Sequence, residues 1–393
     1  MRSNGTGGPS HCQRTAALRL GDTSEVRITG IGLERLVVPL DPPFAAAWDP
    51  EPRRTFAATI VRVETDEGVV GIGSGDTMDG FEPFAHLFIG TDPLAIARQV
   101  RVLETIDFHA GRYWPLEAAL WDIVGQVAGL PVATLFGGAV DALPVYASCG
   151  MLLDPEARAE SAIRLREEGF RAIKIRIARD RIGEGVASVA ATRRAVGDDL
   201  AIMVDLNQGW RMAGDIEPAL DPAAARAVAA ELRELGVLWL EEPLPETDLR
   251  GLAGLRSASG LRIAGGEMTR TFHGLLAALD ADALDVYQPD VVLAAGMLRV
   301  RTVAEVALAR GHWFTPHTWT NGIGLLANLQ VAAGVGGGPF LEYPYDPPGW
   351  TPERRDFMLA EPVRPGPDGV LRVPRTPGLG VVLDETAVRR YAA

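Results

Sequence analysis

The sequence predicts an α/β protein whose larger part is a (β/α)-barrel. From Pro144 onward, short apolar runs recur about every 28 residues, and stretches with helical spacing, such as 156–168 and 297–310, separate them. The runs begin near Val145, Ala172, Ala201, Leu238, Ile263, Val286, Trp313 and Phe340. Strands that alternate with helices indicate parallel βαβ units, and a series of eight favours a closed barrel over an open sheet. We place this barrel at residues 141–345.

The residues before the barrel predict a small α+β domain at 25–140. Apolar and polar residues alternate in three segments, and a turn at 66–68 separates the last two, as in an antiparallel sheet. Two later segments have helical periodicity. The expected strands are 26–40, 55–64 and 69–73, and the expected helices are 92–106 and 116–128.

A loop rich in Pro and Ala, residues 41–54, separates the first two expected strands and carries Phe44 and Trp48. A loop that keeps two large aromatic residues is either a lid over a site or a flap that packs on the protein, and the sequence leaves both open. Residues 76–90 form a second irregular stretch near it.

The two ends of the chain differ in composition from the domains. Residues 1–24 combine Gly, Ser, Asn and Thr with scattered Arg, so we expect a disordered extension. Residues 346–393 are rich in Pro and Gly, with short strands expected at 369–373 and 380–383 and a helical turn at 385–391. We expect this C-terminal segment to pack back on the N-terminal domain and complete a capping domain.

Bulk composition excludes some classes of partner. The formal net charge is −13 and no dense Lys/Arg run occurs, which argues against nucleic acid or an anionic membrane as the main partner. Two cysteines do not make a disulfide framework, so a reducing compartment, the cytoplasm, is expected. No apolar run approaches the roughly 18 to 20 residues of a membrane span.

Three carboxylates lie at the ends of successive apolar runs. Asp205 ends the third run, Glu241 the fourth and Glu267 the fifth, after gaps of 36 and 26 residues. Because the carboxyl ends of parallel strands meet at one rim of a barrel, we expect these side chains to converge. Carboxylate oxygens are the ligands of a hard cation such as Mg²⁺, so the sequence predicts a magnesium site and an enzyme.

Further polar residues end the other strands. Any one of them is most often a helix cap, a rim charge or a structural histidine, but the series runs over strand after strand. Glu241 and Glu242 are adjacent, so only one of them can face the cation, and the other is expected to pair with a neighbouring barrel residue. The remaining candidates are Lys174 and Arg176 on the second strand, Asn207 after the third, Asp290, His317 and Glu342.

This series resembles the enolase superfamily, in its mandelate racemase and muconate lactonizing branch. The motifs run in the order Lys-x-Arg, Asp-x-Asn, Glu-Glu-Pro, Gly-Glu, Pro-Asp, His and Glu. The segments 118–123, 129–132, 135–138 and 377–380 fit the same branch, so the resemblance covers about residues 26–393. It implies the superfamily's barrel with a capping domain, a homo-oligomer and Mg²⁺.

The resemblance also implies roles for single residues. Asp205, Glu241 and Glu267 match the Mg²⁺ ligands, while Lys174 and Arg176 occupy the position of a Lys-x-Lys pair. The superfamily's chemistry uses a Lys or His base, with Mg²⁺ stabilising an ene-diolate. Asp290 and His317 match the superfamily's His-Asp dyad. Glu342 matches the acid on the last strand, and we expect it to be protonated and to donate a hydrogen bond to the ene-diolate.

Arg176 departs from the racemase pattern, which has lysine there. A guanidinium stays charged and is a poor general base, so one face of the substrate's α-carbon lacks a base. Loss of a β-hydroxyl needs only His317, which would take the α-proton and return a proton to the leaving oxygen. We therefore expect an acid-sugar dehydratase, a Mg-dependent carbon–oxygen lyase, with a racemase, epimerase or cycloisomerase as the alternative. A barrel kept for binding without turnover is a third hypothesis.

Residues around the barrel mouth are expected to choose the substrate, a small-molecule carboxylate. Trp48 in the loop 41–54, Trp319 and Asn321 after the seventh strand, and Asn207 are the candidates. Two aromatic residues in the loop suggest a lid that excludes water. The identity of the acid, its stereochemistry and its chain length are not readable from the sequence.

Overall fold

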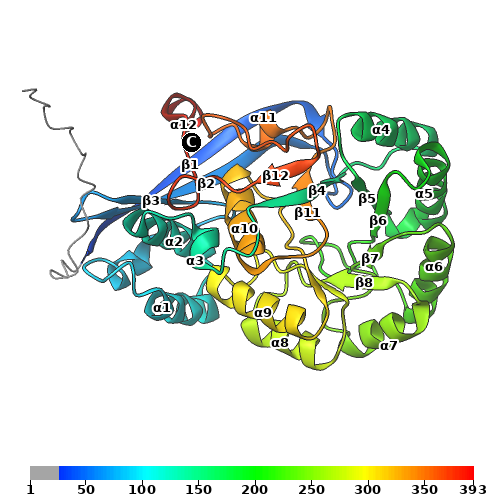
Figure 1. Cartoon of the computed structure of the whole chain (residues 1–393), viewed down its shortest axis with the longest axis horizontal. Helices are drawn as coiled ribbons and strands as arrows, with labels where there is room; N and C mark the ends of the chain where they lie inside the picture. Colours follow the sequence, from blue (N-terminus) through cyan, green and yellow to red (C-terminus); the bar gives the residue numbers. More distant parts are fainter. Residues whose placement is uncertain (1–25) are drawn as a thin grey trace, which may run out of the picture.

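The computed structural model of the protein describes residues 26–393 (Figure 1). The expectation for 1–24 lies outside the described residues. An eight-stranded parallel sheet with surrounding helices forms the larger part, and a three-stranded antiparallel sheet with three helices lies beside it. This is the barrel and capping-domain fold that the sequence predicts.

The barrel strands follow one another in chain order around the sheet, β4-β5-β6-β7-β8-β9-β10, with β11 on the other side of β4. Side-chain and backbone hydrogen bonds join residues 314–318, at and after the end of β10, to residues 338–342, before and at the start of β11: Gly338 N donates to Phe314 O, Thr315 Oγ1 to Phe340 O and Thr318 Oγ1 to Glu342 O. The sheet therefore closes. The strands are β4 (Ala142–Ser148), β5 (Ala172–Arg176), β6 (Ala201–Asp205), β7 (Trp239–Glu241), β8 (Arg262–Gly265), β9 (Val286–Tyr287), β10 (Trp313–Phe314) and β11 (Leu341–Pro344).

Helices follow the first seven barrel strands and cover the outside of the sheet (Figure 1). Capping residues explain where several of them begin: the side chains of Asp154, Asp221, Asp248 and Thr271 accept hydrogen bonds from backbone N–H groups in the first turn of the helix that each precedes. The helices are α4 (Pro155–Glu167), α5 (Ile182–Val196), α6 (Pro222–Glu234), α7 (Leu249–Ser259), α8 (Phe272–Asp280), α9 (Met297–Ala309) and α10 (Gly322–Val335).

Large side chains fill the barrel interior below the carboxyl ends of its strands. Tyr146 and Trp239 are fully buried there, with ring centroids 5.5 Å apart, and Met203, Ala264 and Val286 pack with them. Because side chains alternate across a strand, the polar residues nearer the carboxyl ends enter the barrel above this apolar layer.

The capping domain begins with a long antiparallel hairpin. Strand β1 (Ile28–Phe44) pairs with β2 (Arg53–Thr65), and β2 pairs with β3 (Val70–Gly73). Helices α1 and α2 pack on this sheet through a core of their own. The remaining elements are η1 (Glu82–Leu87), α1 (Ile96–His109), α2 (Trp114–Ala128) and α3 (Val132–Leu135).

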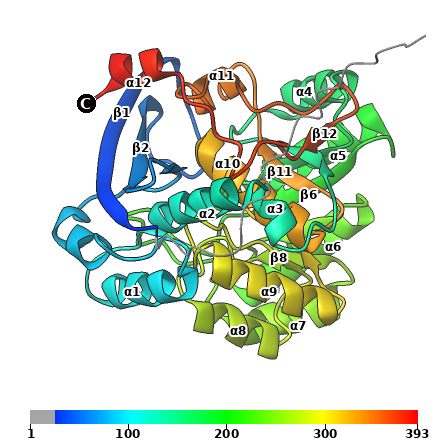
Figure 2. The same cartoon turned by 60° about the vertical axis from the view of Figure 1, so that its left-hand side comes forward.

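The C-terminal segment returns to the capping domain, as expected. Its last helix, α12 (Glu385–Tyr391), lies beside β1, and Ala393 N donates to Arg35 O (Figure 2). Val388 of α12 packs in one apolar cluster with Leu36 of β1. The segment also contains α11 (Pro352–Arg355) and β12 (Val370–Arg372), which pairs with β4. No strand forms at 380–383, where only Leu383 makes a bridge, to Leu359.

The capping domain and the C-terminal segment meet at α2. One carboxylate oxygen of Asp122 accepts from Leu379 N at 2.7 Å and the other from Ile72 N at 3.0 Å. Gly378 approaches α2 closely at φ +85°, and a Cβ there would lie 2.1 Å from Asp122 Oδ1. A side chain would therefore push the two segments apart. Within residues 26–393, no helix is long and apolar enough to cross a membrane.

Candidate active site at the carboxyl ends of the barrel strands

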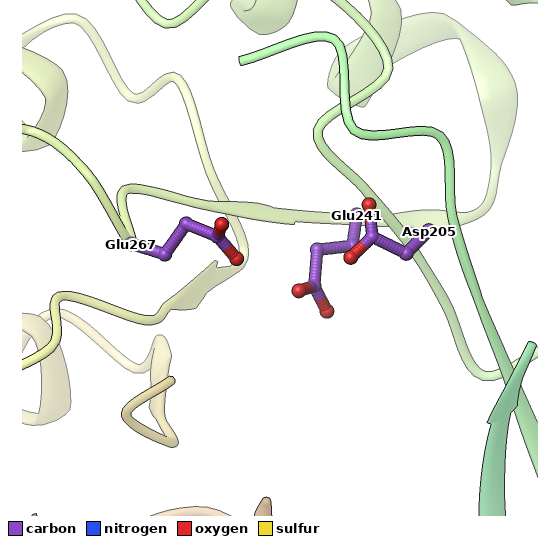
Figure 3. A group of neighbouring side chains, drawn as sticks. All are labelled: Asp205, Glu241 and Glu267. Atoms are coloured by element: carbon purple, nitrogen blue, oxygen red, sulfur yellow. The ribbon is translucent and has the colours of Figure 1, made fainter. Parts of the chain in front are cut away.

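Asp205, Glu241 and Glu267 converge in the barrel mouth. One carboxylate oxygen from each of the three lies within 4.8 Å of the other two, and all three residues are buried. Figure 3 shows Asp205 and Glu267 approaching from opposite sides with Glu241 between them. Asp205 and Glu241 end β6 and β7, and Glu267 follows β8 by two residues. The convergence that the strand spacing predicts is confirmed.

The donor set fits a hard divalent cation. Three carboxylates in a buried space repel one another, and among the residues that the structure describes Glu267 Oε2 has no hydrogen-bond partner. Burial, together with the carboxylates of Glu241 and Glu267, raises the pKa of Asp205, although Arg176 and Lys174 oppose this shift. A cation that takes oxygen ligands would offset the repulsion between the carboxylates and would give Glu267 Oε2 a partner.

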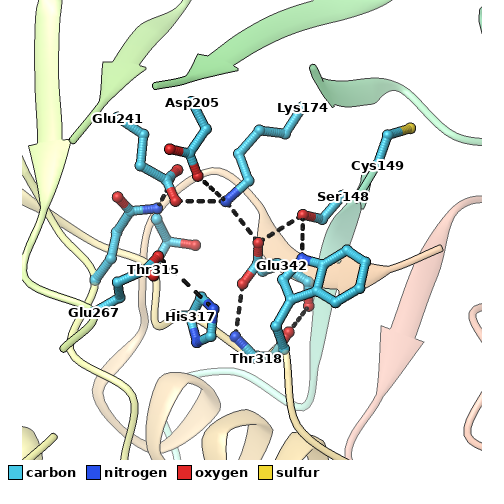
Figure 4. A network of polar contacts seen from close by, with 12 residues as sticks. Ser148, Cys149, Lys174, Asp205, Glu241, Glu267, Thr315, His317, Thr318 and Glu342 are labelled. Atoms are coloured by element: carbon cyan, nitrogen blue, oxygen red, sulfur yellow. Dashed lines mark hydrogen bonds and ion pairs between the residues drawn. The ribbon is translucent and has the colours of Figure 1, made fainter. Parts of the chain in front are cut away.

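Lys174 lies beneath this cluster and does not line the cavity. Its ammonium nitrogen is 2.5 Å from Glu241 Oε1, 2.7 Å from Glu342 Oε1 and 3.5 Å from Asp205 Oδ2 (Figure 4). Burial alone would lower the pKa of Lys174, but the carboxylates of Glu241 and Glu342 raise it above its usual value. Lys174 therefore stays charged and neutralises carboxylates. Lys174, which the resemblance places in the position of a Lys-x-Lys pair, is therefore not among the residues that line the cavity.

Glu342 on β11 is ionised, which corrects the expectation of a protonated acid. Burial would raise its pKa, but Lys174, His317 and Arg176 lower the pKa of Glu342 to about 2. Its two oxygens also accept hydrogen bonds from Ser148 Oγ at 2.7 Å and from Thr318 N at 2.6 Å (Figure 4). A carboxylate that accepts from several donors is stabilised in its charged form.

His317 and Asp290 form a hydrogen-bonded pair. His317 Nδ1 lies 3.0 Å from Asp290 Oδ2, and the other nitrogen, Nε2, faces the cation cluster at 3.8 Å from Glu267 Oε2. Asn328 Nδ2 and Val292 N both donate to Asp290 Oδ1, so this carboxylate is fixed in place. Burial would lower the pKa of His317, but the carboxylates of Glu267, Glu342 and Asp290 raise it to about 9. An Asp at Nδ1 sets the tautomer in which Nε2 is the proton-accepting nitrogen of the neutral ring.

Arg176, the last residue of β5, reaches the same cavity. Its Nη1 bonds Asp205 Oδ2 and, at 3.0 Å, Asn207 Oδ1, and its Nε donates to Cys149 O. The guanidinium carbon lies 4.9 Å from the ring centroid of Trp48 and 5.9 Å from that of Trp319. Arg176 is therefore a fixed cation in the cavity wall.

A cavity of about 160 Å³ lies between these groups. Arg176, Asn207, Glu267 and His317 line it from the barrel, and Arg53 of the capping domain completes its polar lining. The rest of its wall is apolar, formed by Trp48, Trp210, Met212, Met268, Leu293 and Trp319. Of the four residues predicted to bind substrate, Trp48, Trp319 and Asn207 reach this cavity.

Asn321 has another position. Its Oδ1 accepts from Ile323 N and Gly324 N at the start of α10, and its Nδ2 donates to Ser74 Oγ in the capping domain. Asn321 thus caps a helix and does not line the cavity.

Glu242 does not make the pairing with a neighbouring barrel residue that the sequence led us to expect. It adopts φ 45°, is buried, and its carboxylate oxygens have no hydrogen-bond partner among the described residues.

The loop 41–54 both packs and covers. Phe44 is fully buried, stacked on Trp319 at 5.9 Å and 5.1 Å from Trp350, whereas Trp48 is half-buried and lines the cavity. The two readings of this loop therefore apply to different residues: Phe44 anchors the loop on the barrel, and Trp48 forms a wall of the cavity.

Several contacts to the site involve residues that the sequence analysis missed. Trp210 Nε1 donates to Glu267 Oε1 at 2.7 Å, Gln288 Nε2 to Glu241 Oε2 at 2.9 Å, and Trp319 Nε1 to Ser148 Oγ at 2.7 Å. Gln288, two residues before Asp290, could have been found as a strand-end polar residue. Trp210 lies in a loop, where no periodicity indicates the direction of a side chain.

Comparisons with known proteins agree with this geometry. The family model described as Enolase C-terminal domain-like matches residues 157–387, and that described as Mandelate racemase / muconate lactonizing enzyme, N-terminal domain, matches residues 36–137. The resemblance that the motifs indicate is thereby confirmed in both domains.

Relatives that match most of the chain carry related names. The chain is 29% identical to D-galactarolactone cycloisomerase of Agrobacterium fabrum over 93% of this chain and 99% of that protein. It is 32% identical to 3,6-anhydro-alpha-L-galactonate cycloisomerase of Streptomyces coelicolor, with coverages of 86% and 92%. It is 28% identical to L-talarate/galactarate dehydratase of Salmonella typhimurium, with coverages of 84% and 83%.

Solved structures show the same fold. A protein from Bordetella bronchiseptica described as a mandelate racemase superposes with a TM-score of 0.83 at 26% identity, over 94% of this chain and 95% of that one. A racemase from Streptomyces coelicolor with bound magnesium superposes with a TM-score of 0.79 at 28% identity, over 93% of this chain and 100% of that one.

Proposed function

Since this chain belongs to the enolase superfamily, in its mandelate racemase and muconate lactonizing branch, we propose that it is a Mg-dependent acid-sugar dehydratase. The asymmetry of the cavity carries the proposal. Among the described residues of its wall, Glu267 is assigned to the cation, so His317, paired with Asp290, is the one remaining group that can take up and return a proton, whereas Arg176 stays charged. One proton-cycling group suffices for dehydration, whereas racemisation needs one on each face of the α-carbon.

In this proposal, Asp205, Glu241 and Glu267 hold the cation, and Lys174 offsets part of their charge from below. When bound, Mg²⁺ supplies a Lewis acid that stabilises the negative charge developing on the substrate carboxylate. His317 Nε2 accepts the α-proton. The β carbon–oxygen bond then breaks, and the same proton returns to the departing hydroxyl, which leaves as water. The enol that remains becomes a 2-keto-3-deoxy acid.

Arg176 and the aromatic wall bind and orient the substrate. The guanidinium, fixed by Asp205 and Asn207, offers positive charge to the hydroxyl or carboxylate oxygens near the α-carbon. Trp48 and Trp319 limit access of water to the site, which protects the charged intermediate. His317, as a positioned base, contributes roughly 10²- to 10⁴-fold to the rate.

The test is a screen of aldonic and aldaric acids with and without Mg²⁺. We expect a 2-keto-3-deoxy acid, detected with semicarbazide, from at least one acid and only with the metal. Incubation in D₂O should show α-proton exchange for the same acid. Exchange without any keto acid would identify a racemase or epimerase instead. Neither exchange nor keto acid with any acid would leave only a binding role.

Cycloisomerisation is the second candidate. The cycloisomerases of Agrobacterium fabrum and Streptomyces coelicolor, at 29% and 32% identity, favour it, and it needs the same proton abstraction. The mass of the product separates the two reactions, because dehydration removes one water and cycloisomerisation leaves the mass unchanged. The Arg176→Lys variant tests the asymmetry: exchange appearing on a second face of the α-carbon would show that Arg176 is what prevents racemisation.

Two further features are part of the proposal. We expect a homo-oligomer, by family resemblance, and a cytoplasmic location, by the low cysteine count.

A further inference from the structure

Arg53 is the one charged side chain that the capping domain contributes to the cavity wall, as far as residues 26–393 show. The other charged or titratable groups of that wall, Arg176, Glu267 and His317, come from the barrel. Arg53 is the first residue of β2 and lies at the end of the loop 41–54, so it reaches the cavity from the capping domain.

Asp49 holds Arg53 in this position. Its carboxylate bonds Arg53 Nε, and its Oδ1 lies 3.1 Å from Nη2. The Asp49 side chain is 6% exposed, whereas that of Arg53 is 35% exposed. Nη1 of Arg53 has no hydrogen-bond partner among the residues that the structure describes. Asp49 therefore holds the guanidinium in one orientation, and the N–H groups of Nη1 can still donate to a ligand.

Trp48 lies beside both guanidinium groups of the cavity wall. The guanidinium carbon of Arg53 lies 5.9 Å from the centroid of the Trp48 ring, and that of Arg176 lies 4.9 Å from it. Both guanidinium groups therefore lie against one indole ring, Arg176 coming from β5 of the barrel and Arg53 from β2 of the capping domain. A substrate whose first carboxylate reaches the cation can place its other end on Arg53, because Glu267 and Arg53 line the same cavity.

The apolar part of the cavity wall offers few partners for hydroxyl groups. It consists of Trp and Met side chains with Leu293, and the indole N–H groups of Trp210 and Trp319 already donate to Glu267 and Ser148. Against this apolar surface, a guanidinium with free N–H groups selects an anion more strongly than a hydroxyl, because Arg–carboxylate hydrogen bonds are charge-assisted.

We infer that the substrate is a dicarboxylic acid sugar, an aldaric acid, and that Arg53 binds its second carboxylate. This inference rests on the proposed function and narrows its substrate class. Asp49 acts as a positioning residue in it, because it reaches the substrate only through Arg53.

The experiment compares aldaric and aldonic acids of matched stereochemistry, such as galactarate with galactonate, which differ only at the far carbon. We expect kcat/KM of the parent enzyme to be at least about 10-fold higher for the dicarboxylate, the range of a hydrogen bond to a charged group. Arg53→Met should lower kcat/KM for the dicarboxylate at least about 10-fold more than for the monocarboxylate, mainly through KM. Arg54→Met, at the exposed neighbouring position, is the matched control and should change neither.

Asp49→Asn keeps the loop sequence nearly intact and provides a second measurement if Arg53→Met is unstable. It should raise KM for the dicarboxylate more than for the monocarboxylate, a difference that general damage to the fold would not produce. A parent enzyme that prefers monocarboxylates, or variants that affect both classes equally, would overturn the inference while keto acid production keeps the proposed function. Absence of α-proton exchange with every acid would overturn the proposed function itself.

Discussion

The ammonium group of Lys174 lies 2.7 Å from Oε1 of Glu342, and both side chains are fully buried. Lys174 is also the only lysine in the sequence. The remaining positive side chains are arginines, whose pKa stays high in every environment. A single lysine enclosed by three carboxylates is an internal counter-ion for the cation cluster, and it can be followed chemically without interference from other lysines.

Amine-specific acetylation should therefore report on this site. We expect Lys174 to react at least about 100-fold more slowly in the folded protein than in urea, because exposing it requires breaking buried ion pairs. Mass spectrometry of the peptide containing residue 174 measures this rate. Similar rates in the folded and unfolded protein would contradict the buried position.

Magnesium should stabilise the folded protein through the three converging carboxylates. At a concentration roughly 100 times Kd, a ligand that binds only the folded state adds about 3 kcal/mol, visible as a higher thermal unfolding temperature. Asp205→Asn and Glu267→Gln should remove this increase, whereas Glu167→Gln, on the exposed surface of α4, should retain it. An unchanged Mg²⁺ response in both site variants would show that the cation binds elsewhere.

His317 should be required for α-proton exchange and Asp290 should assist it. We expect His317→Asn to lower the exchange rate in D₂O by roughly 10²- to 10⁴-fold, the usual contribution of a general base. Asp290→Asn should have a smaller effect, because His317 keeps a hydrogen-bond partner at Nδ1 but loses the charge that favours its protonated form. NMR of the α-proton signal measures both. Exchange at the parent rate in His317→Asn would assign the base to another residue.

Stability should fall as pH rises through the titration of Glu117. Burial raises the pKa of Glu117 from its ordinary value near 4.5 to about 7, although hydrogen bonds from Leu298 N and Trp121 Nε1 lower it. The folded state then holds a proton that the unfolded state has released, so the free energy of unfolding decreases between about pH 4.5 and 7, by about 3 kcal/mol.

Glu117→Gln should remove this dependence, because the amide retains the accepting oxygen and carries no charge. The free energy of unfolding of the variant relative to the parent, measured with urea, should thus increase as pH rises from about 4.5 to 8, by about 3 kcal/mol. The same substitution at Glu167 is the control. A constant difference between variant and parent over this range would show that Glu117 titrates normally.

The aromatic anchor of the loop 41–54 should matter for stability. Phe44→Ala removes a fully buried ring that stacks on Trp319, and we expect it to cost about 3 to 5 kcal/mol of the free energy of unfolding. Phe108→Ala, at a side chain that is 84% exposed, should cost no more than about 0.5 kcal/mol. Equal effects of the two substitutions would mean that the loop does not pack as described.

Much of the site was readable from the sequence because of how a parallel barrel is built. Residues at the carboxyl ends of consecutive strands share one rim, so the strand-end positions of Asp205, Glu241 and Glu267 were enough to predict their convergence. The pairing of Asp290 with His317 follows from neighbouring strands in the same way. The period of the apolar runs likewise determined the barrel, because each strand–helix unit spans a fixed length of chain.

The direction of a side chain beyond a strand end was decided only by the tertiary structure. Lys174 sits beneath the carboxylates, Glu342 is ionised, Asn321 caps a helix, and Arg53 and Trp210 reach the cavity. Each of these positions and charge states depends on contacts between residues far apart in the chain. The contact between Arg176 and Trp48 is another of this kind. Periodicity fixes the face of a strand, but loops lack a period, so packing alone sets where their side chains point.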